Sequence, residues 1–70
     1  MTIDKVKKIV LENKNKKKKF IYKGTRNQID EFIGTINETY PVIFTIKLED
    51  NSIKSYSYSD ILIGNLKIID

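Results

Sequence analysis

The chain has 70 residues, no cysteine, no histidine and a formal net charge of +4. A chain of this length forms a single domain with a small core, and without Cys or His it lacks disulfides, the common zinc ligands and the usual general base of enzymes. Its longest apolar runs, such as Ile9-Val10-Leu11, are three residues, too short for a signal-peptide core or a membrane span, so we expect a soluble cytoplasmic protein.

The charge is divided unevenly along the chain. Residues 1–26 hold ten basic and two acidic residues, a net charge of +8, whereas residues 27–70 hold three lysines and seven acids, a net charge of −4. This division suggests a basic arm or face on a mildly acidic body. The thirteen isoleucines, twelve lysines against one arginine and absence of alanine are also typical of an AT-rich coding sequence, which enriches lysine without selection for binding.

Residues 1–13 are predicted to form an amphipathic helix. Thr2 can cap its first turn, where Asp4 interacts favourably with the helix dipole. At 100° per residue, one face of this helix carries four apolar side chains, those of Ile3, Val6, Ile9 and Val10. A basic amphipathic helix can lie on a membrane, but this one has no aromatic residue. We therefore expect it to pack against a sheet, and we predict no membrane partner.

A run of lysines follows the helix, in the stretch "NKNKKKKF" at residues 13–20. One interpretation is a basic edge that contacts phosphates, which makes nucleic acid a possible partner. That edge would consist of Lys16, Lys17, Lys18, Lys19, Lys23 and Arg26. The other interpretation is a polar connector between helix and strand, and the residues alone leave both open.

After the lysines the hydrophobic period changes from 3.6 to 2, which predicts a mainly β domain over residues 14–70. The predicted strands cover residues 18–25, 28–40, 42–49, 53–59 and 66–70. Gly34 suggests a bulge or a tight bend within the second strand, and Pro41 should lie at a strand start or on an edge. Five short strands can hide their edges by curling, so we predict a small SH3-like five-stranded barrel with an N-terminal α-helix.

The third strand alternates most clearly. Its core-facing side chains are expected to be those of Val42, Phe44, Ile46 and Leu48. The turn signal Asp50-Asn51-Ser52 should join this strand to the fourth in a hairpin. A single helical turn, with Asp60 as its cap, is expected before the last strand.

Catalytic patterns are missing from the sequence. Gly24-Thr25-Arg26 lacks the further glycines and the Gly-Lys-Ser/Thr ending of a phosphate-binding loop. Glu38 and Asp60 are two carboxylates without a predicted cleft. We expect no enzyme, no metal and no cofactor. Three tyrosines could stack on bases, although in so small a barrel at least two should pack in the core or rim: Tyr40, Tyr56 and Tyr58.

Two stretches resemble the Veg family, small bacterial proteins described as stimulators of biofilm formation. They are "GTINETYPVIFTIKL" at residues 34–48 and "SYSYSDIL" at residues 55–62, and the resemblance covers roughly residues 24–64. It implies an SH3-like barrel and a regulatory, non-catalytic role, because Veg-like proteins are thought to antagonise a transcriptional repressor of matrix genes. One departure is the family's Gly-Gly-Arg-Arg-Lys-type cluster, which reads Gly24-Thr25-Arg26-Asn27-Gln28 here.

The resemblance therefore implies a protein partner involved in transcriptional control. Candidate contacts for it are the motif residues Glu38, Tyr40, Tyr56, Tyr58 and Asp60. The run Glu38-Thr39-Tyr40-Pro41 has two interpretations, a corner between strands or a binding surface with Tyr40 as its aromatic anchor. Self-association through an edge of the barrel is a third possibility for the domain.

Overall fold

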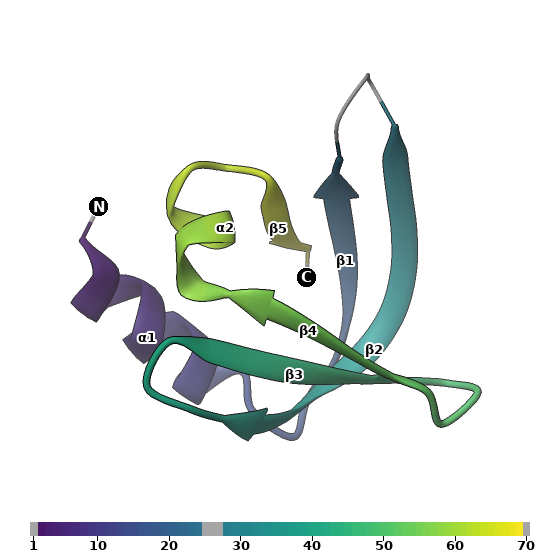
Figure 1. The fold of residues 1–70 in the computed structure, drawn as a ribbon. Helices are drawn as coiled ribbons and strands as arrows, with labels where there is room; N and C mark the ends of the chain where they lie inside the picture. The colour runs from purple at the N-terminus through teal and green to yellow at the C-terminus, as the bar shows by residue number, and fades with distance from the viewer. Residues whose placement is uncertain (1, 25–27, 70) are drawn as a thin grey trace.

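The computed structural model describes residues 2–24 and 28–69 (Figure 1). Its elements are α1 (Ile3–Glu12), β1 (Lys17–Lys23), β2 (Ile29–Thr39), β3 (Ile43–Leu48), β4 (Ile53–Ser57), α2 (Tyr58–Leu62) and β5 (Leu66–Ile69). The N-terminal helix, the five strands and the short helix before the last strand are confirmed. Within the described ranges, no helix has the length and apolar character needed to cross a membrane.

Helix α1 forms where the sequence predicts it. The Thr2 side-chain oxygen accepts a hydrogen bond from the Lys5 amide at 3.3 Å, which satisfies one of the free donors at the helix start. At the other end, the Asn13 side-chain amide donates to the Ile9 carbonyl at 2.8 Å. Val6 and Val10 are fully buried, so the apolar face of α1 packs on the sheet as expected.

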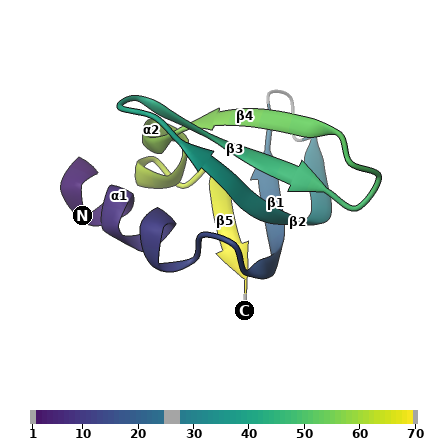
Figure 2. The same ribbon diagram turned by 90° about the horizontal axis from the view of Figure 1, so that it is seen from below.

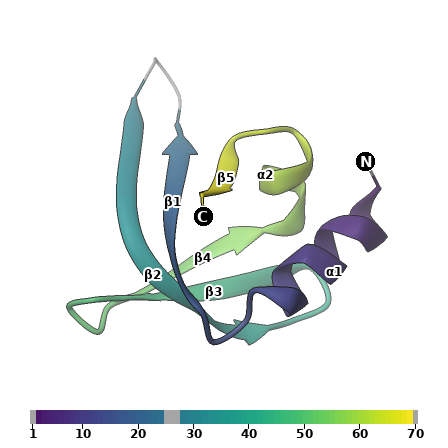
Figure 3. The same cartoon turned by 180° about the vertical axis from the view of Figure 1, so that it is seen from behind.

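The five strands form one antiparallel sheet in the order β4-β3-β2-β1-β5. The long strand β2 pairs with β1 along its first part and with β3 along its second part. Figures 1 and 3 show β2 bending as it passes from one hairpin to the other. In Figure 2 the two helices lie together at one side of the molecule, away from the β1–β2 hairpin.

The sheet is not closed, so the SH3-like barrel expected from the sequence is not confirmed. In the part of the chain that the structure describes, β4 pairs only with β3, and β5 pairs only with β1. At Ser57, a capping box with Asp60 ends β4 and starts α2. The chain then crosses to the far edge of the sheet, which leaves β4 and β5 as separate edge strands.

Gly34 lies where β2 pairs with both of its neighbours, opposite Lys18 on β1 and Leu48 on β3. A Cβ atom there would lie 2.6 Å from the Ile46 Cγ2 atom and 2.9 Å from the Lys47 carbonyl oxygen. Glycine is needed because the strands approach closely at this point. The irregular pairing lies later, between Ile36 and Thr39, so of the bulge or tight bend suggested at Gly34, the bulge is wrong.

The core lies between the sheet and the two helices. It consists of Val6, Val10, Phe20, Ile36, Phe44, Ile46, Tyr58 and Leu66. Phe44 and Ile46 are fully buried and Leu48 is half-buried, as the alternation in the third strand predicts. Val42 was expected in the core but is 70% exposed, because it lies in the turn before β3, where the alternation of the strand does not apply.

Candidate functional site: an exposed corner beside helix α1

The motif Glu38-Thr39-Tyr40-Pro41 forms the corner between β2 and β3. The Tyr40 amide donates to the Ile43 carbonyl at 2.8 Å, which closes the turn. Pro41 has no amide hydrogen to satisfy and is exposed at the tip. Pro41 therefore lies before a strand start, as the sequence predicts.

Tyr58 holds this corner from behind. Its hydroxyl donates to the Tyr40 carbonyl at 2.8 Å, and its backbone amide donates to the Val42 carbonyl at 3.3 Å. The side chain is 4% exposed and packs on Phe44, with ring centroids 5.4 Å apart. Burial raises the pKa of the Tyr58 hydroxyl above its ordinary value.

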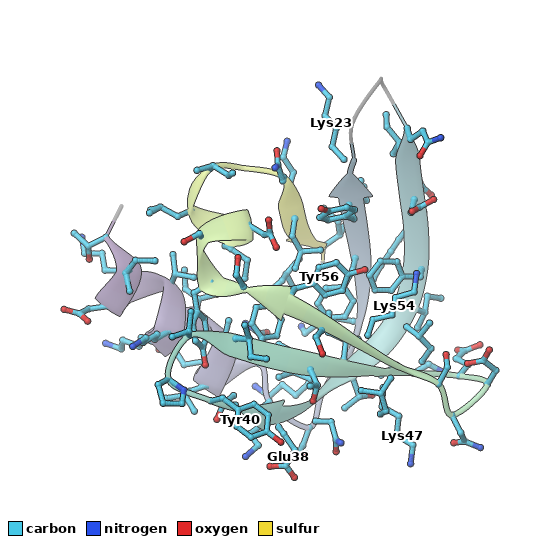
Figure 4. All side chains as sticks on the ribbon, in the orientation of Figure 1. Lys23, Glu38, Tyr40, Lys47, Lys54 and Tyr56 are labelled. Carbon is cyan, nitrogen blue, oxygen red and sulfur yellow. The ribbon has the colours of Figure 1, made fainter. Side chains whose placement is uncertain are left out.

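The side chains of the corner are free of these constraints. Tyr40 is 49% exposed and Val42 is 70% exposed, although their backbone carbonyls are both fixed by Tyr58. Figure 4 shows Tyr40 and Glu38 projecting at the same edge of the molecule. The corner therefore presents apolar side chains on a rigid backbone, an arrangement that lowers the entropic cost of binding.

A small cavity of about 200 Å³ lies between this corner and α1. Its lining residues are Ile3, Lys7, Pro41, Val42, Tyr58 and Ser59. The Lys7 ammonium lies 5.6 Å from the centre of the Tyr58 ring, so a cation lies on a mostly apolar wall. The cavity is smaller than the usual pocket for a small molecule. It is suited to one aliphatic side chain, and Lys7 could interact with a neighbouring carboxylate.

Tyr56 does not belong to this surface. It packs among aromatic rings on the inner face of the sheet, with its ring centroid 5.1 Å from that of Tyr22 and 6.0 Å from that of Phe32. Burial, followed by the negative charges of ionised Tyr22, Asp30 and Asp60, raises the pKa of Tyr56. Lys54 lies beside it, 5.1 Å from the centre of the Phe32 ring (Figure 4). Tyr56 and Tyr58 thus have packing roles, which leaves Tyr40 as the exposed member of the three tyrosines.

The two motif carboxylates have separate environments. The Asp60 carboxylate accepts a hydrogen bond from the Ser57 amide at 3.2 Å. Asp60 was expected to cap this helical turn, but Ser57 is the N-cap and Asp60 is the third helical residue of the capping box. Glu38 is exposed on β2, where its amide donates to the Thr45 hydroxyl at 3.1 Å. The described residues contain no group of three or more potential metal ligands.

The lysine run is divided between the connector after α1 and strand β1. Lys17, Lys18 and Lys19 lie in β1, and Lys16 precedes the strand in an exposed position. Since side chains alternate along a strand, Lys17 and Lys19 share the outer face with Lys23, whereas Lys18 lies on the opposite face.

Among the described residues, Lys17 and Lys19 form ion pairs with acids. The Lys17 ammonium lies 2.7 Å from a Glu49 carboxylate oxygen. The Lys19 ammonium lies 3.3 Å from that of Glu31. These pairs reduce the positive charge that β1 offers to phosphates. Arg26, the last residue of the predicted basic edge, lies outside the described residues.

Sequence reasoning missed the part of the candidate site that α1 contributes. Ile3 was assigned to the packing face of the helix, and Lys7 was not considered. Both residues line the cavity beside Pro41. A signal was present, because residues four apart on a helix lie on the same face. The helix would still have had to be placed next to the corner, and the sequence does not give that relationship.

The comparisons with known proteins bear on the whole chain. A family model described as biofilm formation stimulator VEG matches residues 1–69. A search of the curated proteins found no match. The family match includes the corner, the capping box and helix α1, and it extends beyond the two stretches that resemble the family in the sequence. The chain therefore belongs to the Veg family.

Proposed function

We propose that this chain is a non-catalytic cytoplasmic regulator that promotes biofilm formation by binding and antagonising a transcriptional repressor. The observation that carries the proposal is the family match over residues 1–69, because that family is described as a stimulator of biofilm formation. The repressor as target is what the resemblance of the motif stretches to Veg-like proteins implies.

The corner between β2 and β3 is the proposed contact surface. Its support is the contrast between a backbone held by Tyr58 and side chains that are left exposed at Tyr40 and Val42. Exposed aromatic side chains on a preorganised backbone are typical anchors of protein interfaces. The cavity lined by Ile3, Lys7 and Pro41 offers the partner an adjacent recess for an aliphatic side chain.

The proposal is tested with the repressor of biofilm-matrix genes from the same host, bound to its fluorescently labelled operator DNA. Adding the wild-type chain should release the DNA and lower its fluorescence anisotropy. Tyr40→Ala and Val42→Asp should each require about tenfold more protein for half-release, since loss of an interface anchor costs upward of about 1–2 kcal/mol. Circular dichroism should show that both variants remain folded.

Ile53→Ala is the matched control, because Ile53 is also an exposed apolar residue, at 50%, but lies on β4 away from the cavity. It should release DNA as the wild type does. If excess wild-type chain leaves the repressor on its operator, the proposed antagonism is wrong. If Tyr40→Ala and wild type release DNA equally, a different surface makes the contact.

A further inference from the structure

Strand β5 has a free edge next to an apolar groove. The strand pairs with β1 on one side only. Along its other side runs a cavity of about 360 Å³, and α1 and α2 each contribute an isoleucine to its walls. The lining residues are Ile9, Ile61, Gly64, Leu66, Lys67, Ile68 and Ile69. Both helices therefore border the free edge and leave space beside it.

The pairing with β1 identifies which backbone groups face this groove. The Lys23 amide donates to the Asn65 carbonyl at 2.7 Å, so this pair belongs to the hydrogen-bonded set of the ladder. Hydrogen-bonded pairs alternate along an antiparallel ladder. The backbone groups of Lys67 and Ile69 therefore point toward β1, and the N–H and C=O groups of Leu66 and Ile68 point toward the free edge.

The side chains around the groove follow the same alternation. Leu66 and Ile68 lie on the inner face of the sheet, where Leu66 is 1% exposed and Ile68 packs against the core. Lys67 lies between them on the outer face and is exposed. In the described ranges, no ion pair is found for Lys67. The free edge thus offers an apolar, a cationic and an apolar position in succession.

We propose that the free edge of β5 binds an extended segment of another protein as a sixth, antiparallel strand, with an aliphatic–acidic–aliphatic sequence. The two aliphatic residues pair with Leu66 and Ile68 and point inward toward Ile9 and Ile61. The acidic residue lies opposite Lys67 on the outer face. This mode of recognition takes its affinity from main-chain hydrogen bonds and its specificity from alternate side chains.

A second copy of this chain fits the edge less well. If two β5 strands pair around a two-fold axis, with Leu66 of each copy opposite Ile68 of the other, Lys67 lies directly opposite Lys67 of the second copy. Like charges directly opposite across a ladder are destabilising. A shifted register removes this repulsion but shortens an already short strand pairing. The free edge therefore favours an acidic partner segment. This edge shares no residue with the corner between β2 and β3, so its binding does not rest on the proposed function.

The test uses the blocked peptide Thr-Val-Glu-Val-Thr and the isotopically labelled chain. The peptide is added to about 10 mM, a range suited to weak millimolar binding, and the amide NMR signals of the chain are followed. The signals of Leu66 and Ile68 should shift until they saturate, and their hydrogen exchange should slow. A peptide with both valines N-methylated should not bind, because it cannot donate to the edge. Unsaturable or absent shifts at these residues would overturn the proposal, as would equal binding of the methylated peptide.

The acidic preference is tested by exchanging charges. The peptide Thr-Val-Lys-Val-Thr should bind the wild type about two- to fivefold more weakly than the acidic peptide, in line with the strength of cross-strand charge pairs. Lys67→Glu should reverse that preference. Lys47→Glu is the matched control, since Lys47 is an exposed lysine on β3 and its change alters the net charge equally. The proposal is wrong if Lys47→Glu also reverses the preference. It is also wrong if the amide chemical shifts of β5, measured without peptide, depend on protein concentration, because that would indicate self-association.

Discussion

The hydroxyl of Tyr58 donates a hydrogen bond to the backbone carbonyl of Tyr40 across 2.8 Å, between residues 18 apart in the sequence. The donor side chain is buried, and the acceptor residue exposes its own ring to solvent. One tyrosine of the motif thus fixes the backbone from which the other projects. The shape of the corner therefore depends on the first residue of α2.

Removing this hydroxyl should weaken the corner without removing a core side chain. Tyr58→Phe should lower the free energy of unfolding by about 0.5–1.5 kcal/mol, the usual net contribution of a hydrogen bond. Urea denaturation measures the change. Tyr22→Phe is the control, because Tyr22 is a half-buried tyrosine whose hydroxyl has no hydrogen bond among the described residues, and it should change the stability by less than about 0.5 kcal/mol. Equal effects of the two changes would contradict this role for the Tyr58–Tyr40 bond.

The two packed tyrosines should make the fold sensitive to alkali. Burial raises the pKa of both Tyr56 and Tyr58 above the ordinary value of 10.0. Between about pH 10 and the raised pKa values of these tyrosines in the folded chain, the folded chain binds more protons than the unfolded chain. Their contribution to stability is therefore complete below about pH 10 and is lost as the pH rises further.

The double change Tyr56→Phe and Tyr58→Phe should reduce this alkaline loss. Urea midpoints at pH 7, 9, 10.5 and 11 measure it, and the titration of the lysines is common to both proteins and cancels in the comparison. The same loss of stability above pH 10 in both proteins would show that these tyrosines do not cause it.

Alanine substitutions at Phe44 and Val42 compare the loss of stability at a buried and at an exposed position. Phe44 is fully buried and contacts the rings of Tyr56 and Tyr58. Phe44→Ala should cost about 3–5 kcal/mol, from lost burial and the cavity that remains. Val42→Ala should cost less than about 0.5 kcal/mol, because that side chain is largely exposed. Thermal or urea unfolding of the three proteins distinguishes the positions, and a Phe44→Ala protein with an unchanged midpoint would remove Phe44 from the core.

Alanine substitutions at Gly34 and Gly24 test whether β2 and β3 approach too closely at Gly34 to leave room for a side chain. Gly34→Ala places a methyl group against the Ile46 side chain and the Lys47 backbone, so it should destabilise by about 1–3 kcal/mol. Gly24→Ala meets its nearest neighbour, a Tyr22 ring atom, at 3.7 Å. That change should be neutral or should stabilise by up to about 1 kcal/mol, because alanine restricts the unfolded chain. A harmless Gly34→Ala change would contradict the close packing of β2 on β3.

The ion pairs on β1 lead to a prediction about nucleic acid. Because Lys17 and Lys19 are paired with Glu49 and Glu31, we expect weak DNA binding by the wild type even at 50 mM salt. Glu31→Gln together with Glu49→Gln should strengthen it and steepen the slope of log affinity against log salt by up to about 1.8, the value for two added phosphate contacts. The prediction is contradicted if the wild type binds DNA tightly, with a slope of about −3.6 as expected for four phosphate contacts, and if this binding is lost when Lys16–Lys19 are changed to glutamine.

The sequence predicted the elements well because each carries its own local signal. The apolar face around Val6 and Val10 and the alternation around Phe44 and Ile46 depend on nearby residues alone. The errors arose where two signals compete. The charge of the lysine run suits either a connector or a basic edge, and the predicted strand began at Lys18, whereas pairing of β1 with β2 begins at Lys17. Ser57 and Asp60 both suit a helix start, and only the hydrogen bonds assign the N-cap to Ser57.

Closure of the sheet and assembly of the corner could not be predicted in this way. Both depend on how elements distant in the sequence are placed relative to one another. The motif identified Tyr40 as a candidate anchor, and the structure shows its side chain exposed. The contribution of Ile3 and Lys7 from α1 arises only once the helix is docked beside Pro41.

The strand order also bears on the time course of folding. Strands β1, β2 and β3 each pair with the next strand in the chain, whereas β5 pairs with β1, the most distant strand in the sequence. Short loops close at a lower entropic cost than long ones, so we expect the hairpins to form first and β5 to join last. Pulse-labelling hydrogen exchange during refolding checks this order, and early protection of the Lys67 amide would contradict it. The strand that joins last is held by one neighbour and, at four residues, is shorter than the other edge strand, β4, so it should also be the first to detach in native fluctuations.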